Sequence, residues 1–149
     1  MSVEQVEQVA RDFVTAMTDV EKTKAYLTPD AMVSGGVLPQ PMPAMDALGL
    51  VAGMKAAFPD LKFDVQQITV NGNQATVKVQ LSGTNTGTLS MPLPGMPGSI
   101  PPTGKKVSVP DAFVVTVQGD KVSQMEVVSP ADGGLPAVLG QIGVKMPGM

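Results

Sequence analysis

The fold is decided by residues 62–84, which read KFDVQQITVNGNQATVKVQLSGT. Apolar side chains occupy alternate positions on both sides of Asn71-Gly72, a dipeptide typical of tight hairpins. This period of two predicts two antiparallel strands, each with one apolar face. The phase of the alternation slips by one position across Gln66-Gln67, where we expect a β-bulge.

Two more strands are predicted after this hairpin. From Val107 to Val117 every odd position is apolar except Asp111, so the carboxylate shares its face with apolar neighbours. Gly119-Asp120 then marks a turn, and a fourth strand runs from Lys121 to about Ser129.

Three helices are predicted before the hairpin, and one short helix after the last strand. Ser2 begins the first helix with a capping box. Pro29 and Pro59 end the second and third, because the residue before a proline avoids helical geometry. The four helices are expected within Ser2 to Met17, Asp19 to Leu27, Pro43 to Phe58 and Leu135 to Ile142. The predicted fold class is therefore α+β.

Composition limits the chemistry. The 149 residues are expected to form one domain, 1–149, with a net charge of -3. The absence of cysteine excludes disulfides, thiolate nucleophiles and the common zinc and iron–sulfur sites. Histidine is also absent, so proton transfer would have to use a carboxylate, a lysine or Tyr26. We expect neither a metal ion nor another cofactor.

The distribution of charge and hydropathy bears on partners and location. Basic residues are scattered singly apart from Lys105-Lys106, and only 3% of residues are aromatic, which argues against nucleic-acid binding. The first residues carry Glu4 where a signal peptide has basic residues, and no apolar run approaches membrane-spanning length. We expect a cytoplasmic protein without a membrane partner.

Four short motifs carry a resemblance to a known family. They are FPDLKF at 58–63, GTNTG at 83–87, IPPTGK at 100–105 and DAF at 111–113. In this order they resemble the SnoaL-like polyketide cyclases, a branch of the nuclear transport factor 2-like superfamily. The resemblance implies a cone-shaped, curved antiparallel β-sheet packed against three N-terminal helices, with a pocket between them. It also implies that Asn85 replaces a common histidine.

The same resemblance bears on the reaction. The acid-base aspartate and supporting histidine of the cyclases match most nearly Phe113 and Val127 in this chain, and both of these residues are apolar. The aldol-cyclisation mechanism is therefore not carried over.

Asp111 is the strongest candidate for chemistry. A carboxylate on an apolar strand face loses hydration, which raises its pKa and suits it to act as a general acid or base. Many SnoaL-like proteins are similar in having Asp two positions before Phe. The alternative is a structural role, in which Asp111 accepts hydrogen bonds from the backbone or Tyr26, or lies near water at the pocket mouth.

Other residues are candidates for ligand binding. Asn85 could orient a carbonyl or hydroxyl group, or could instead satisfy the loop after its strand. Tyr26 could donate a proton to an oxyanion, although core packing is the commoner use of tyrosine. An apolar lining is predicted from Met17, Met32, Met54, Phe58, Phe113, Met125 and Val127, each of which could equally be plain core.

Two functions fit these observations. One is a cofactor-independent cyclase, isomerase or hydrolase that acts through Asp111 on a small, largely apolar carbonyl compound. The other is a non-catalytic module that binds a small hydrophobic ligand. Val114, Val122 and Val128 on the outer sheet face predict a homodimer. The Met- and Pro-rich residues 91–98 are expected to form a lid over the pocket or to pack on the dimer partner.

Overall fold

The computed structural model describes residues 2–35, 40–90, 99–130 and 133–143. The predicted lid, 91–98, lies outside the described residues. In chain order the elements are α1 (Val3–Ala16), α2 (Val20–Tyr26), β1 (Leu27–Gly35), β2 (Met42–Pro43), α3 (Ala44–Ala57), β3 (Lys62–Asn71), β4 (Gln74–Thr84), β5 (Leu89–Ser90), β6 (Ser99–Ile100), β7 (Lys106–Gln118), β8 (Lys121–Val127) and α4 (Gly134–Gln141).

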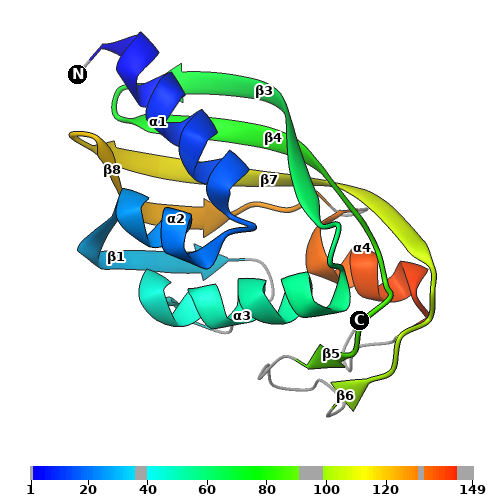
Figure 1. The fold of residues 1–149 in the computed structure, drawn as a ribbon. Helices are drawn as coiled ribbons and strands as arrows, with labels where there is room; N and C mark the ends of the chain where they lie inside the picture. The colour runs from blue at the N-terminus through cyan, green and yellow to red at the C-terminus, as the bar shows by residue number, and fades with distance from the viewer. Residues whose placement is uncertain (1, 36–39, 91–98, 131–132, 144–149) are drawn as a thin grey trace.

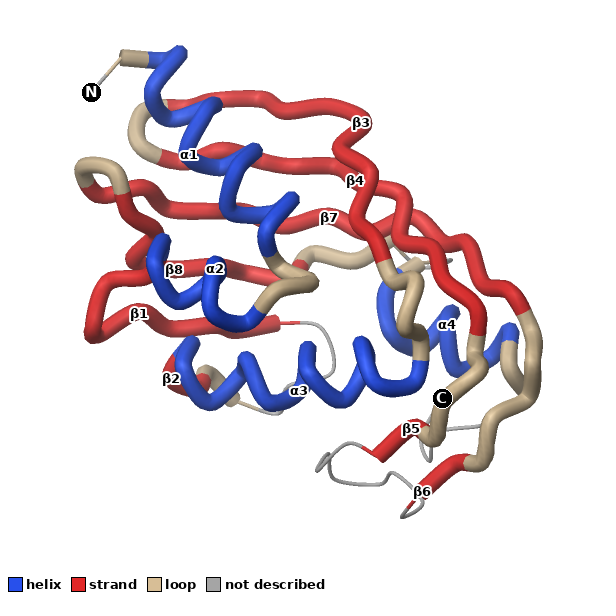
Figure 2. The backbone as a smooth tube through the Cα atoms, in the orientation of Figure 1, coloured by secondary structure: helices blue, strands red, loops and turns tan. Residues whose placement is uncertain are grey.

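Six of the strands form one curved sheet in the order β2-β1-β8-β7-β4-β3. The first three helices lie on the same side of this sheet, as Figures 1 and 2 show. The predicted α+β cone is confirmed. One feature differs from the prediction, because β1 runs parallel to β8 while the other pairs of this sheet are antiparallel.

The parallel strand follows directly from the short helix before it. Asp19 caps α2 by accepting a hydrogen bond from the Lys22 N–H at 3.1 Å. The helix ends at Tyr26, and the backbone of the next residue, Leu27, is already extended, so the chain enters the sheet with no intervening turn. The sequence did not predict β1, which contains Pro29 near its start.

The central hairpin forms as predicted. Gly72 adopts a φ of 64° in the turn between β3 and β4, a conformation that suits glycine. The pairing register shifts between Val65 and Gln67, which confirms the predicted bulge. Odd-numbered residues of β4 and β7 are buried along both strands.

Val122 corrects the prediction for the outer face. Thr116 pairs with Gln124 but Val117 pairs with Val122, so Ser123 is an extra residue that reverses the side-chain alternation. Val122 is therefore fully buried in the core instead of lying on the outer face. The homodimer stays a prediction, and only Val114 and Val128 of the three valines still support it.

The buried residues form two hydrophobic clusters along the inner face. The first cluster lies under α1 and includes Phe13, Val77 and Phe113. The second cluster joins the end of α3 to α4 and includes Phe58, Leu81 and Val138. The predicted C-terminal helix is confirmed, and Gly143 follows it with a φ of 88°.

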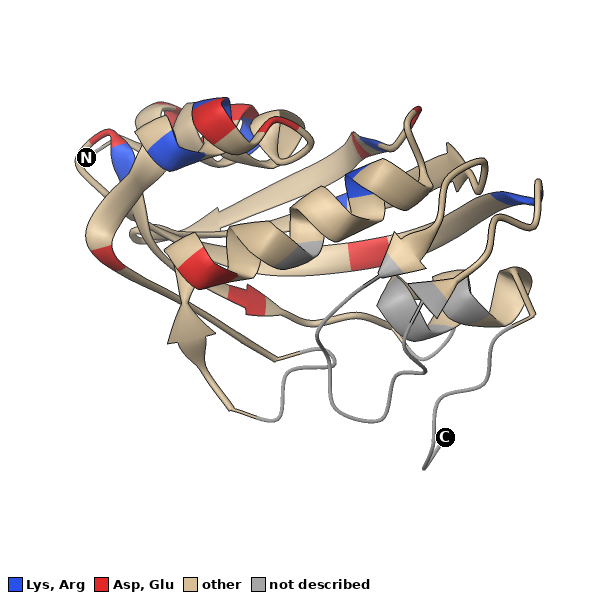
Figure 3. Cartoon of the chain, turned by 60° about the horizontal axis from the view of Figure 1, so that its bottom comes forward, with Lys and Arg blue, Asp and Glu red and all other residues tan. Residues whose placement is uncertain are grey.

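Charged residues of both signs lie on all three N-terminal helices, in turns and along the strands (Figure 3). Two of the ion pairs, Arg11–Glu7 and Lys24–Glu21, are exposed pairs within a single helix. Among the described helices, none is long and apolar enough to cross a membrane.

Candidate functional site

Asp111 lies at the boundary between the two hydrophobic clusters. It is on the inner face of β7, opposite Val79 of β4, and only 7% of its surface is exposed. Its neighbours on the same face of β7 are Val109, which belongs to the second cluster, and Phe113, which belongs to the first. The carboxyl group is therefore held among apolar side chains, as the sequence predicted.

The two oxygens of this carboxyl group have different surroundings. The Ser129 hydroxyl donates a hydrogen bond to Oδ1 at 2.6 Å, and the Ala112 N–H donates to the same oxygen at 2.8 Å. Among the described residues, no group donates a hydrogen bond to Oδ2. Within the part of the chain that the structure describes, both hydrogen bonds to this carboxyl group therefore fall on Oδ1.

Burial raises the pKa of Asp111 above its ordinary value. The hydrogen bonds from Ser129 and from the Ala112 N–H act in the opposite direction, because they stabilise the charged form, but burial outweighs them. A carboxyl group with a raised pKa can hold a proton closer to neutral pH than an exposed aspartate, and can both donate and accept it.

Two glycines allow the chain to cover Asp111. β8 ends at Val127, and the following segment lies against β7 where the edge of that strand opposite β4 has no strand partner. A Cβ atom at Gly133 would overlap the carbonyl oxygen of Pro110, and one at Gly134 would overlap the Ser129 hydroxyl. Only glycine at both positions permits this close approach.

At its other end, α4 is tied to the same edge of β7. The Gln141 side chain accepts a hydrogen bond from the Ser108 N–H at 3.0 Å and donates one to the Ser108 carbonyl at 3.2 Å. The amide of Gln141 thus makes the two hydrogen bonds to Ser108 that a neighbouring strand would otherwise make at this edge of β7. Neither Ser129 nor Gln141 was predicted from the sequence, although the adjacent glycines Gly133 and Gly134 are a pattern that can accompany a close approach of the backbone.

The structure separates the predicted apolar lining into groups. Met17, Phe113 and Met125 belong to the first cluster, with Tyr26 and Val127 packed against it, whereas Met54 and Phe58 belong to the second. Phe113 of β7 pairs with Val127 of β8. Its ring also makes an edge-to-face contact with the ring of Phe63, and the two ring centroids are 6.0 Å apart. Phe113 is thus the predicted lining residue that follows Asp111 on the inner face of β7, and Val127 lies opposite Phe113 on β8.

Met32 corrects one of the lining predictions. It alternates along β1 with Ala31 and Val33, which are buried, so its own side chain lies on the opposite face and is 37% exposed.

Asn85 is fully buried and is held by four hydrogen bonds to the protein. Its amide nitrogen donates to the carbonyl oxygens of Ala57 and Gly87 at 3.3 and 3.0 Å. Its Oδ1 accepts from the N–H and the hydroxyl of Thr103 at 2.9 and 2.8 Å. The two donors and two acceptor positions of the amide are therefore all used.

Asn85 and Asp111 do not meet. Val79 is the partner of Asp111 on β4, and Asn85 lies six positions further along the chain. At about 3.3 Å per residue, the two side chains are separated by roughly 20 Å along the sheet. The structure therefore does not bring Asn85 and Asp111 onto one small ligand.

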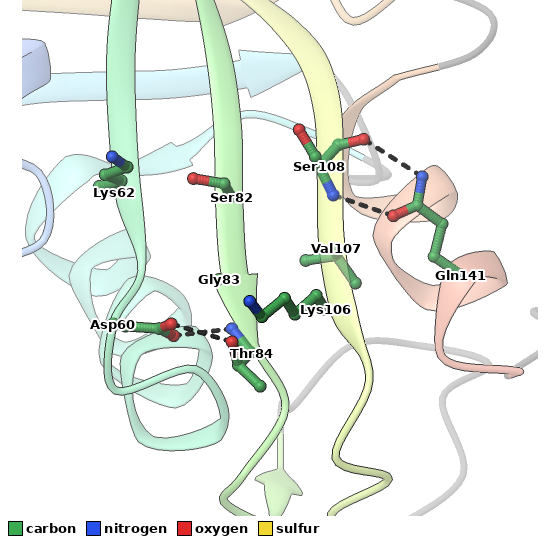
Figure 4. A pocket seen from close by; sticks show the side chains of 9 residues that line it. All are labelled: Asp60, Lys62, Ser82, Gly83, Thr84, Lys106, Val107, Ser108 and Gln141. Atoms are coloured by element: carbon green, nitrogen blue, oxygen red, sulfur yellow. Dashed lines mark hydrogen bonds between the residues drawn. The ribbon is translucent and has the colours of Figure 1, made fainter.

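An open recess lies on the other face of the sheet, near the ends of β3, β4 and β7 (Figure 4). Its volume is about 720 Å³, and it is lined by Asp60, Lys62, Ser82, Gly83, Thr84, Lys106, Val107, Ser108 and Gln141.

Hydrogen bonds from the Thr84 N–H and hydroxyl, at 2.7 and 2.9 Å, lower the pKa of Asp60. Among the described residues, no three acidic side chains gather as a metal site would require.

A curved sheet crossed by three helices on its inner face defines the nuclear transport factor 2-like fold. The family model for the SnoaL-like domain matches residues 10–125, so the chain belongs to the SnoaL-like family. No curated protein matches the sequence.

Solved structures are similar over nearly the whole chain. A proposed SnoaL-like polyketide cyclase from Jannaschia sp. CCS1 has 23% sequence identity and a TM-score of 0.74, and the match covers 95% of each chain. AclR from Streptomyces galilaeus, a proposed hydroxylase, has 19% identity and a TM-score of 0.75, over 95% of this chain and 83% of AclR. IdmH from Streptomyces antibioticus, a proposed polyketide cyclase, has 21% identity and a TM-score of 0.71, over 94% of this chain and 99% of IdmH. At these identities the likeness establishes the fold alone.

Proposed function

We propose that this protein binds a small, largely apolar carbonyl compound on the inner face of the sheet and moves a proton on it through Asp111. The observation that carries the proposal is the buried carboxyl group at the boundary of two hydrophobic clusters, with Oδ2 free of hydrogen bonds from the described residues. Phe113 and Val127 supply apolar surface beside it. The proposed activity is that of a cofactor-independent cyclase, isomerase or hydrolase.

The simplest reaction of this class is proton transfer next to a carbonyl group. The ionised carboxylate removes a proton from the adjacent carbon, and the electron pair of that C–H bond forms an enolate. Protonated Asp111 then returns the proton to a carbon or oxygen of the same molecule, and the carboxylate is restored. A raised pKa favours this cycle, because the group must accept and release the proton near the working pH.

The test uses ketones in deuterated water. A panel of cyclic and aryl ketones is first screened for binding by native mass spectrometry, and the bound compounds are then followed by NMR for exchange of the protons next to the carbonyl. We expect the wild-type protein to catalyse exchange and Asp111→Asn to reduce the rate by about 10²–10⁴-fold. Asp60→Asn is the matched control, because Asp60 accepts the same kinds of hydrogen bond outside the inner face.

The alternative function is a non-catalytic module that binds a hydrophobic ligand. It is favoured by the apolar Phe113 and Val127 at the positions where the resemblance implies the catalytic pair of the cyclases. Ketone binding by the wild-type protein without proton exchange would support this alternative and reject the proposed catalysis.

A further inference from the structure

We propose that Ser129 is a positioning residue for Asp111, which holds Oδ1 and thereby leaves Oδ2 as the oxygen that gives and takes the proton. The contact that carries this inference is the 2.6 Å hydrogen bond from the Ser129 hydroxyl to Oδ1. Its catalytic meaning rests on the proposed function. The hydrogen bond itself can be tested on the free protein.

The backbone around Ser129 fixes the position of its hydroxyl group. On one side, the Val128 N–H donates to the Ala112 carbonyl at 2.9 Å, which ties the segment to β7 next to Asp111. On the other side, the Gly133 N–H donates to the Pro130 carbonyl at 3.0 Å. Ser129 is thus presented to the carboxyl group from a segment that is held at both ends.

Gly134 leaves space for the Ser129 side chain. Its φ is 71°, and a Cβ atom there would overlap the Ser129 hydroxyl while lying 3.7 Å from Oδ1 of Asp111. The start of α4 therefore closes over the Ser129–Asp111 contact. A serine hydroxyl is small enough to reach the carboxyl group under this cover.

Two donors on one oxygen distinguish the two oxygens chemically. A protonated carboxyl group has one oxygen that accepts hydrogen bonds and one that carries the proton. Because Ser129 and the Ala112 N–H both donate to Oδ1, that oxygen is the acceptor and the proton belongs on Oδ2. The same two donors hold the ionised form, so the carboxyl group does not rotate when the proton leaves.

The two hydrogen bonds to Oδ1 also oppose the rise in the pKa of Asp111 that burial causes. Hydrogen bonds to a carboxylate favour its charged form, and of the two donors Ser129 is the larger influence on the pKa of Asp111. No charged side chain of the described residues is among the causes of the raised pKa. Ser129 therefore restrains the pKa that burial raises, and allows Asp111 to serve as a base as well as an acid.

The test is a ¹³C NMR titration of the Asp111 carboxyl carbon in the free protein. We expect a higher pKa in Ser129→Ala than in the wild type, because the stronger of the two hydrogen bonds to the carboxylate is lost. Ser129→Thr, which keeps a hydroxyl group, should restore the wild-type pKa. Ser123→Ala is the control, because the Ser123 hydroxyl donates to the Thr116 carbonyl and does not contact Asp111.

An unchanged or lower pKa in Ser129→Ala overturns the inference, and so does a Ser129→Thr variant that titrates like Ser129→Ala. The result is independent of the ketone experiment. If the pKa responds to Ser129 but no ketone exchanges protons, only the proposed catalysis fails. If exchange depends on Asp111 but the pKa does not respond to Ser129→Ala, only this inference fails.

Discussion

Asp60 and Asp111 each accept one hydrogen bond from a backbone N–H and one from a hydroxyl group, yet their pKa values move in opposite directions. Thr84 supplies both donors to exposed Asp60, whose pKa is lowered. Ser129 and Ala112 supply the donors to buried Asp111, whose pKa is raised. With the donors matched in kind, burial is the difference that decides the sign.

The two carboxyl groups also differ in which of their oxygens accept hydrogen bonds. At Asp60, Thr84 occupies both oxygens, and nearby Lys106 further favours the charge. At Asp111 both donors share one oxygen. The polar groups near Asp60, including Asn85, hold loops in place, whereas Oδ2 of Asp111 accepts no hydrogen bond from the described residues.

The largest loss of stability is expected when Asn85, whose side chain holds the loops near Asp60, is replaced. Replacement by alanine removes the four side-chain hydrogen bonds that join Asn85 to Ala57, Gly87 and Thr103. At about 0.5–1.5 kcal/mol for each hydrogen bond, we expect Asn85→Ala to lower the free energy of unfolding by about 2–6 kcal/mol. Urea denaturation measures this loss.

The control for Asn85 is Thr86→Ala, at an exposed position of the same loop. We expect it to change the free energy of unfolding by less than about 0.5 kcal/mol. If the two variants were equally stable, the assignment of Asn85 to loop structure would fail, and a direct role in ligand binding would regain support.

A smaller effect is expected at Asp60. A lowered pKa in the folded state stabilises the protein above the unfolded value of about 3.9, and this contribution is lost as the pH falls through the folded pKa. Asp60→Asn should therefore be less stable than the wild type near neutral pH and equal to it in strong acid. Chemical denaturation at several pH values measures the difference.

Asp64→Asn is the comparison for this experiment, because Asp64 is also exposed but has only a 3.5 Å ion pair with Lys62. We expect Asp64→Asn to change the free energy of unfolding by less than about 1 kcal/mol, as is usual for the loss of an exposed ion pair. An Asp60→Asn variant whose stability differs from that of the wild type equally at all pH values would mean that the Thr84 contacts do not favour the charge.

The sequence predicts those parts of this structure that depend on local periodicity. The hairpin, its bulge and the inward position of Asp111 all follow from residues within one or two strands. The sheet position of β1 does not, because its parallel neighbour β8 lies far along the chain. Val122 was misplaced because the bulge at Ser123 is set by pairing with β7.

The contacts of the candidate site were harder to predict than its central residue. Alternation alone places Asp111 on the apolar face, but Ser129 meets it through a segment 18 positions away. Asn85 likewise bonds to Ala57 and Thr103, which are 28 and 18 positions distant. No local pattern in the sequence specifies such partners.

The most direct test of the central claim is the free energy of unfolding of the wild type and of Asp111→Asn between about pH 3 and pH 8. Below the unfolded pKa of about 3.9 Asp111 is protonated in both states, so the two proteins should be almost equally stable. As the pH rises towards the raised folded pKa, the unfolded chain releases its proton first, and the wild type loses stability that Asp111→Asn retains. The account predicts that Asp111→Asn is the more stable protein near neutral pH. A variant that is less stable there, or that differs from the wild type by the same amount at every pH, would contradict it.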